Sequence, residues 1–122
     1  MQKFVILILP IILLLGSCEL NDYPYVKIKT PVNNQVFNAP EVIKIEAEMQ
    51  SGDAIANEGL IVTKVNATHD TIIHNRGEGW QGNKMVHLID SFISEPATKY
   101  KIVASGVGGS GWSYDSIFIT TN

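Results

Sequence analysis

The chain is built from short runs in which apolar and polar residues alternate, and this period of two limits its possible folds more than any other feature. Residues 42–49 show the pattern best, because charged residues alternate there with four apolar ones: Ile43, Ile45, Ala47 and Met49. Side chains of a β-strand point alternately to its two faces, so the run predicts a strand with one buried face. Comparable runs predict strands at residues 25–29, 42–49, 59–65, 71–74, 84–90, 100–105 and 116–120.

No window beyond residue 20 repeats apolar residues at helical spacing between start and stop signals. About seven short strands therefore predict an all-β fold, a small antiparallel sandwich. A chain of 122 residues with one cysteine allows one such domain without an internal disulfide. Its net charge of −3 argues against a dedicated nucleic-acid binder, which usually carries a basic excess.

The N-terminus has the layout of an export signal. A short positive segment is followed by an apolar run over residues 4–15, which is too short to span the roughly 30 Å hydrocarbon core of a bilayer. Leu15-Gly16-Ser17-Cys18 follows and resembles the lipobox of bacterial lipoprotein precursors. Two alternatives remain, a secreted protein whose Cys18 lies by chance near the cleavage site, and an uncleaved membrane anchor.

The lipobox resemblance implies that the cysteine thiol receives diacylglycerol, that the chain is cut before it, and that its new amine is acylated, with palmitate as a typical chain. No other cofactor is expected. The implied organisation is a signal peptide at 1–17, a lipidated tether at 18–24 and one domain at 25–122. Two or three acyl chains give stable anchoring, since each buried CH₂ contributes about 0.8 kcal/mol. Glu19 follows the cysteine, which favours the outer membrane, facing either the periplasm or the cell surface.

Two segments of the expected domain resemble immunoglobulin-like sandwiches. Residues 31–37 resemble the turn between the first two strands of bacterial immunoglobulin-like domains, with Asn34 where glycine is usual and Phe37 as an apolar anchor. Residues 96–104 resemble the start of strand F in immunoglobulin-like and fibronectin type III domains, with Tyr100 placed as a tyrosine corner. The resemblance implies a sandwich of about seven strands. Another small sandwich or a β-barrel is the alternative.

Motifs for catalysis or metal binding fail on their context. Gly106-Val107-Gly108-Gly109-Ser110-Gly111 matches a dinucleotide fingerprint, but a strand follows it instead of a helix, so we expect a flexible hairpin. Zinc needs three or four convergent ligands, and His69, His74 and His87 are better explained as surface residues, although a turn at residues 75–77 would bring the last two together. Residues 51–58 lack the spacing of a calcium loop. The sequence predicts no enzyme and no metal site.

Three aromatic residues are candidates for partner binding. Trp80, Trp112 and Tyr114 lie in or beside glycine-rich segments, and exposed rings can stack on sugars or pack against a protein. The alternative is that they anchor loops on the core. Asp70-Thr71-Ile72 and Asp115-Ser116-Ile117, both expected near strand starts, resemble the O-glycosylation acceptor of some Bacteroidota envelope proteins, with Thr71 and Ser116 as acceptors.

The sequence as a whole favours a membrane-anchored lipoprotein of the bacterial cell envelope that acts as a non-enzymatic binding, adhesion or structural module. The alternative is a carbohydrate-binding accessory lipoprotein of a glycan-uptake system. The expected partners are the membrane, through Cys18, and a protein or glycan of unspecified identity.

Overall fold

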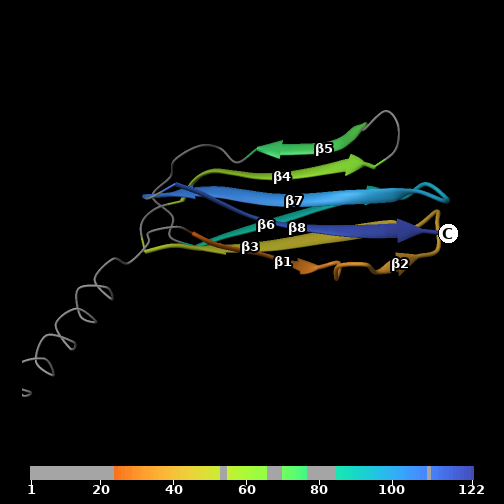
Figure 1. Ribbon diagram of the computed structural model, residues 1–122, viewed down its shortest axis with the longest axis horizontal. Helices are drawn as coiled ribbons and strands as arrows, with labels where there is room; N and C mark the ends of the chain where they lie inside the picture. The colour runs from red at the N-terminus through yellow and green to blue at the C-terminus, as the bar shows by residue number, and fades with distance from the viewer. Residues whose placement is uncertain (1–23, 53–54, 66–69, 77–84, 110) are drawn as a thin grey trace, which may run out of the picture.

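The computed structural model describes residues 24–52, 55–65, 70–76, 85–109 and 111–122, and there it consists of strands and connecting segments. Two sheets pack face to face (Figure 1). One has three strands in the order β1-β3-β6, and the other has five in the order β2-β8-β7-β4-β5. The strands are β1 (Tyr25–Thr30), β2 (Val36–Phe37), β3 (Val42–Gln50), β4 (Ala56–Lys64), β5 (Thr71–Arg76), β6 (Met85–Ile93), β7 (Lys99–Gly108) and β8 (Gly111–Thr121).

This strand order is that of an immunoglobulin-like sandwich, which confirms the expected fold class. The strands β1, β3 and β6 correspond to A, B and E of such a fold, while β4, β7 and β8 correspond to C, F and G. All described pairs are antiparallel except β2, which pairs parallel with β8. The described ranges contain no helix with the length and apolar character needed to cross a membrane.

Each of the seven predicted runs overlaps a strand, but some bounds differ: residue 65 follows the end of β4, and residue 84 lies outside the described ranges. The short strand β2 was not predicted, since it has only two residues. β4 begins at Ala56 instead of residue 59, ahead of a register irregularity that includes Asn57 at φ 50°. β8 begins at Gly111 instead of residue 116 and pairs with β7 up to Gly108. The hairpin expected at 106–111 is thus the connection between β7 and β8, and paired strand reaches Gly108 on one side of it and Gly111 on the other.

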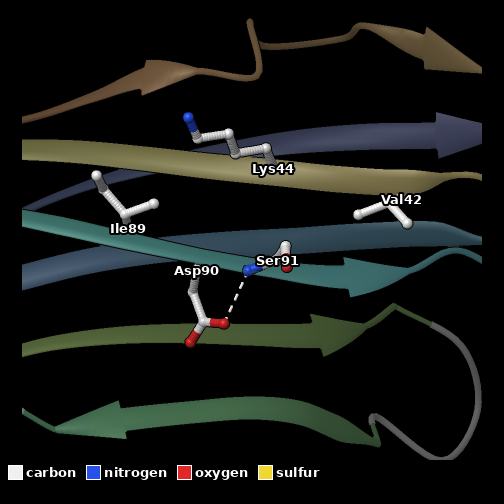
Figure 2. A pocket seen from close by; sticks show the side chains of 5 residues that line it. All are labelled: Val42, Lys44, Ile89, Asp90 and Ser91. Atoms are coloured by element: carbon white, nitrogen blue, oxygen red, sulfur yellow. Dashed lines mark hydrogen bonds between the residues drawn. The ribbon is translucent and has the colours of Figure 1, made fainter.

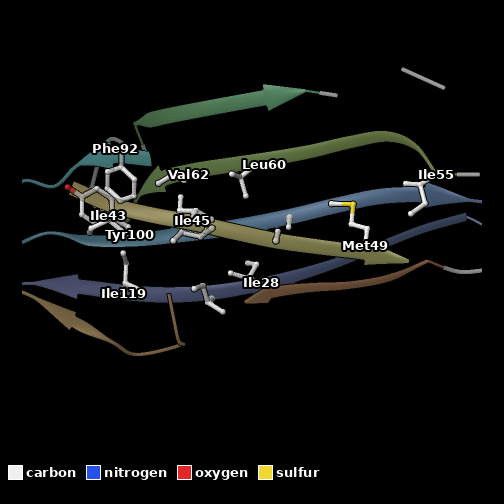
Figure 3. Packing of buried hydrophobic residues seen from close by; sticks show 14 residues of the cluster. Ile28, Ile43, Ile45, Met49, Ile55, Leu60, Val62, Phe92, Tyr100 and Ile119 are labelled. Atoms are coloured by element: carbon white, nitrogen blue, oxygen red, sulfur yellow. The ribbon is translucent and has the colours of Figure 1, made fainter. Parts of the chain in front are cut away.

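The core lies between the sheets and follows the alternation of the sequence (Figure 3). In β3 the buried positions are the four apolar residues at every second place, and every other residue of the strand is exposed or half-buried. Each large apolar side chain that is fully buried contributes about 1.5–3 kcal/mol. The buried cluster comprises Ile28, Ile43, Ile45, Ala47, Met49, Ile55, Leu60, Val62, Phe92, Tyr100, Ile102, Ala104, Ile117 and Ile119.

Tyr100 forms the tyrosine corner that the sequence predicted. Its side chain is completely buried, and its hydroxyl oxygen accepts a 2.8 Å hydrogen bond from the backbone N–H of Glu95. The ring meets Phe92 edge to face, with the centroids 4.9 Å apart. The residue thus joins the loop before β7 to the core and to β6 in the opposite sheet.

The segment between β1 and β2 carries the N-terminal part of the domain from one sheet to the other. Asn34 has a φ of 67°, the left-handed conformation that the sequence predicted for it. Its backbone N–H donates to the carbonyl of Phe118 at 2.7 Å, and Asn33 Oδ1 accepts from the N–H of Phe118 at 2.9 Å. These two bonds attach the turn to β8, and Phe37 then packs against the core.

Replacing Tyr100 by phenylalanine is expected to lower the free energy of unfolding by about 1–3 kcal/mol, because the partly buried N–H of Glu95 loses its acceptor. Urea denaturation followed by tryptophan fluorescence measures the change. Tyr114→Phe is the matched control, since that side chain is 72% exposed, and it should shift stability by less than about 0.5 kcal/mol. Equal effects of the two substitutions would contradict the tyrosine corner.

Candidate functional site

Trp112 and Tyr114 are the most conspicuous feature of the outer surface of the five-stranded sheet. Trp112 is 61% exposed and Tyr114 is 72% exposed. Both lie in β8 at alternate positions, so their side chains share the face that points away from the core. Positions two apart in a strand are about 6.6 Å apart, which places the rings side by side. Both belong to β8, directly after the glycine-rich segment, and neither ring is folded back on the core.

The residues beside these rings are small or apolar. Val107 of β7 pairs with Trp112, and Ser105 of β7 pairs with Tyr114. Gly59 of β4 pairs in turn with Ser105, and residues opposite each other on neighbouring strands share a face. A Cβ atom at Gly59 would meet its nearest neighbours at ordinary contact distances of 3.5 and 3.7 Å, so the sheet surface there is simply bare. We call these five residues the aromatic strip.

The other end of the same face is cationic. Lys99 Nζ lies 4.7 Å from the ring centroid of Phe118, and Lys101 Nζ lies 5.9 Å from it. Both lysines belong to β7 and Phe118 belongs to β8, with Ser116 between Phe118 and the aromatic strip. The outer surface of this sheet therefore changes from uncharged rings to positive charge along β8.

The tight packing beneath the strip explains one of the glycines. Gly106 of β7 faces the core, and a Cβ atom there would lie 3.0 Å from Met49 Sδ and 3.1 Å from Ile55 Cγ2. Glycine at this position lets β7 approach the opposite layer closely. At Gly106, therefore, the glycine of this segment is required by the packing of the core.

Asp115 and Ser116 point to opposite faces of β8. Asp115 Oδ2 accepts a 2.9 Å hydrogen bond from the backbone N–H of Ile28, at the register irregularity of β1. Ser116 is exposed on the same face as Tyr114, two positions away. It lies in the middle of β8, not near a strand start as expected, whereas Thr71 is the exposed first residue of β5. Both candidate acceptors are therefore at the surface.

The structure places His74 and His87 in different sheets. His87 lies on the outer face of the three-stranded sheet opposite Glu48, and His74 belongs to β5 of the other sheet, opposite Ile61. Asn75 and Arg76 continue β5, so the turn suggested there was wrong. Among the described residues no group of three His, Cys, Asp or Glu could hold a metal ion. Cys18, Glu19, His69 and Trp80 lie outside the described ranges, as do residues 1–23 as a whole.

Two lysine–glutamate ion pairs shift the pKa values of Glu48 and Lys64. Lys29 Nζ lies 3.1 Å from Glu48 Oε2, and this hydrogen bond lowers the pKa of Glu48. Lys64 Nζ lies 2.6 Å from Glu95 Oε2, which raises the pKa of Lys64. Both are surface ion pairs outside the aromatic strip.

Within the described ranges, Glu58 Oε2 is a buried side-chain oxygen without a hydrogen-bond partner. A single carboxylate oxygen does not by itself make a binding site.

A shallow hollow of about 450 Å³ lies on the opposite surface of the molecule (Figure 2). It is formed by β3 and β6 and is lined by Val42, Lys44, Ile89, Asp90 and Ser91. Sequence reasoning did not find it. The sequence did contain an indication of it: the predicted strand at 84–90 has apolar side chains on both faces. Only one face can pack against the core, so the apolar side chains of the other face must be exposed.

The comparisons with known proteins establish the fold. Fibronectin(III)-like modules of CbhA from Clostridium thermocellum superpose with a TM-score of 0.54 and 18% identity, over 85% of this chain and 49% of theirs. Superoxide reductase (neelaredoxin) from Ignicoccus hospitalis superposes with a TM-score of 0.53 and 11% identity, over 87% of this chain and 85% of its own. This chain thus spans about half the length of the first structure.

No protein-family model matches the sequence, and no curated protein matches it. At the identities found among solved structures, the likeness shows an immunoglobulin-like, fibronectin III-like sandwich and carries no activity over to this chain.

Asp115→Ala is expected to destabilise β1, because the partly buried N–H of Ile28 loses a charged acceptor, at a cost of about 1–3 kcal/mol. Hydrogen exchange should show faster exchange of the Ile28 amide. Ser116→Ala changes the next residue on the exposed face and should leave that amide unaffected. Unchanged Ile28 exchange in Asp115→Ala would show that the carboxylate does not hold β1.

Proposed function

We propose that this protein is a membrane-anchored lipoprotein of the bacterial cell envelope that works as a non-enzymatic binding module. The observation that carries the proposal is the exposure of Trp112 and Tyr114, at 61% and 72%, side by side on one face of a sheet. Large exposed rings on a rigid surface supply contact area at little entropic cost, and such residues dominate binding energies at interfaces.

The geometry of the aromatic strip favours a flat ligand surface. Ser105 and Gly59 have small side chains or none, so neither residue rises far above the sheet surface beside Tyr114, and Val107 beside Trp112 adds apolar area. The strip lies on strands of a hydrogen-bonded sheet, so it needs little reorganisation when a partner binds. The lysines near Phe118 would favour a partner whose acidic groups lie on one side of its apolar contact.

A second candidate is carbohydrate recognition for a glycan-uptake system. The supporting observation is that uncharged rings stand next to the hydroxyls of Ser105 and Ser116 on one face. Rings that stack on the apolar faces of sugars, together with nearby hydroxyls, make a suitable sugar-binding surface. A glycan carried by Ser116 itself, which is the O-glycosylation hypothesis, would lie over Tyr114 and compete with both functions.

The membrane anchor is supported by the sequence of the first 18 residues. The apolar run, the small residues Gly16 and Ser17, and the single cysteine at 18 fit a lipid anchor. In this proposal the acyl chains on Cys18 hold the sandwich at the outer membrane, on its periplasmic face or at the cell surface.

Trp112→Ala and Tyr114→Ala are each expected to weaken partner binding by about tenfold or more, as is typical of exposed aromatic hot spots. Capture from envelope extracts and a glycan panel provide the two readouts, and they separate a protein partner from a carbohydrate. Tyr25→Ala is the matched control, because Tyr25 is 57% exposed on the other sheet. Full binding by both strip variants would refute the proposed face.

Cys18→Ser is expected to abolish fatty-acid labelling and to leave residues 1–17 on the protein. Mass spectrometry of the purified native protein and its variant measures both, and protease treatment of intact cells distinguishes a periplasmic from a surface location. Native protein that keeps its first 17 residues would exclude the lipid anchor, whatever the outcome for the aromatic strip.

A further inference from the structure

The strand β6 forms one border of the three-stranded sheet β1-β3-β6. It pairs with β3 along its whole length, and within the described parts of the chain no strand pairs with its other side. The strand has nine residues and contains neither proline nor lysine, which are common means of protecting an exposed edge. A long edge without such protection is a template for another strand, so any other residue that blocks it matters.

The hydrogen-bond pattern tells which backbone groups face this free edge. The N–H of Ser94 donates to the carbonyl of Glu41 at 2.9 Å, one step beyond the pair formed by Ile93 and Val42. Bonded and non-bonded pairs alternate along an antiparallel ladder. The residues whose N–H and C=O groups point away from β3 are therefore Met85, His87, Ile89, Ser91 and Ile93.

These five residues are matched to a second copy of the same strand. In an antiparallel arrangement centred on Ile89, that residue would face its own copy, His87 would face Ser91, and Met85 would face Ile93. Apolar side chains would meet apolar ones and polar side chains would meet polar ones. The three apolar members are already exposed, with Met85 at 54%, Ile89 at 57% and Ile93 at 71%.

Asp90 blocks this edge. Its Oδ1 accepts a 2.7 Å hydrogen bond from the N–H of Ser91, which is one of the edge-facing donors. Its Oδ2 accepts a 3.3 Å hydrogen bond from Asn75 Nδ2 of β5 in the other sheet. Figure 2 shows the carboxylate pointing from β6 toward β4, on the side opposite to Ile89. The carboxylate thus occupies a backbone donor that a second strand would need.

We propose that the free edge of β6 is a self-pairing surface for a second copy of this chain, and that Asp90 keeps it closed. The carboxylate removes the Ser91 donor from each copy and would bring two negative charges close to the two-fold axis. Without it, the two three-stranded sheets would join into one, with Val42 beside Ile93 extending the apolar contact. This surface is separate from the aromatic strip and does not depend on the function proposed for it.

The test combines Asp90→Ala with a cysteine at the expected axis. Residues that face each other in a bonded antiparallel pair have Cα atoms about 5.5 Å apart, which suits a disulfide. In the full chain in detergent, Ile89→Cys with Asp90→Ala should form a disulfide-linked dimer, and Asp90→Ala alone should double the particle mass in sedimentation. Ile89→Cys with Asp90 intact should stay monomeric.

Three controls make the result specific. Ser91→Cys with Asp90→Ala should not crosslink, because position 91 faces position 87 in this register. Asp90→Ala without an added cysteine reports any crosslinking through Cys18. Asp70→Ala removes the same charge from an exposed residue outside β6 and should not associate.

Circular dichroism verifies folding, and Asp90→Thr replaces the alanine variant if that one does not fold. Monomeric Asp90→Ala and Asp90→Thr would overturn the proposal. So would a dimer of Ile89→Cys that forms with Asp90 in place, or equal crosslinking through positions 89 and 91.

Discussion

The sandwich depends on two sheets that each hide every second side chain against the other. The buried positions of β3 and β7 alternate strictly, and a shift of either strand by one residue would expose its whole apolar set. This requirement fixes the register of the central strands. Tyr100 then ties the loop ahead of β7 to the core through the N–H of Glu95. The hydrogen bond from the backbone N–H of Ile28 to the Asp115 carboxylate joins β1 to β8 of the other sheet.

The strands that build this core were predictable from the sequence because burial imposes a period of two. The roles of Asn34 and Tyr100 were predictable for a different reason, because the segments around them resemble immunoglobulin-like domains, and the positive φ and the buried hydroxyl agree with that resemblance. The start of β8 was not. Its first residues alternate between exposed rings and half-buried polar groups, so their place in a strand depends on pairing with β7, which only the folded chain defines.

The candidate site was partly predictable. Exposed aromatic residues at 112 and 114 were identified as contact residues, but their common face required the strand that carries them. The bare surface at Gly59 depends on Ser105 of another strand, and the role of Asp115 depends on Ile28, which is 87 residues away in the chain. The protection of the β6 edge was invisible for the same reason, because Asp90 and Asn75 belong to different sheets.

The strands β1 and β8 point the same way (Figure 1), and the bond between Ile28 and Asp115 aligns them. Tyr25 precedes Ile28 by as many positions as Trp112 precedes Asp115, so the aromatic strip lies at the end of the sandwich where the chain enters it. If the chain is anchored at Cys18 as proposed, that end would face the bilayer. The rings would then meet molecules lying low over the lipid surface, and anything extended far above it would be out of reach.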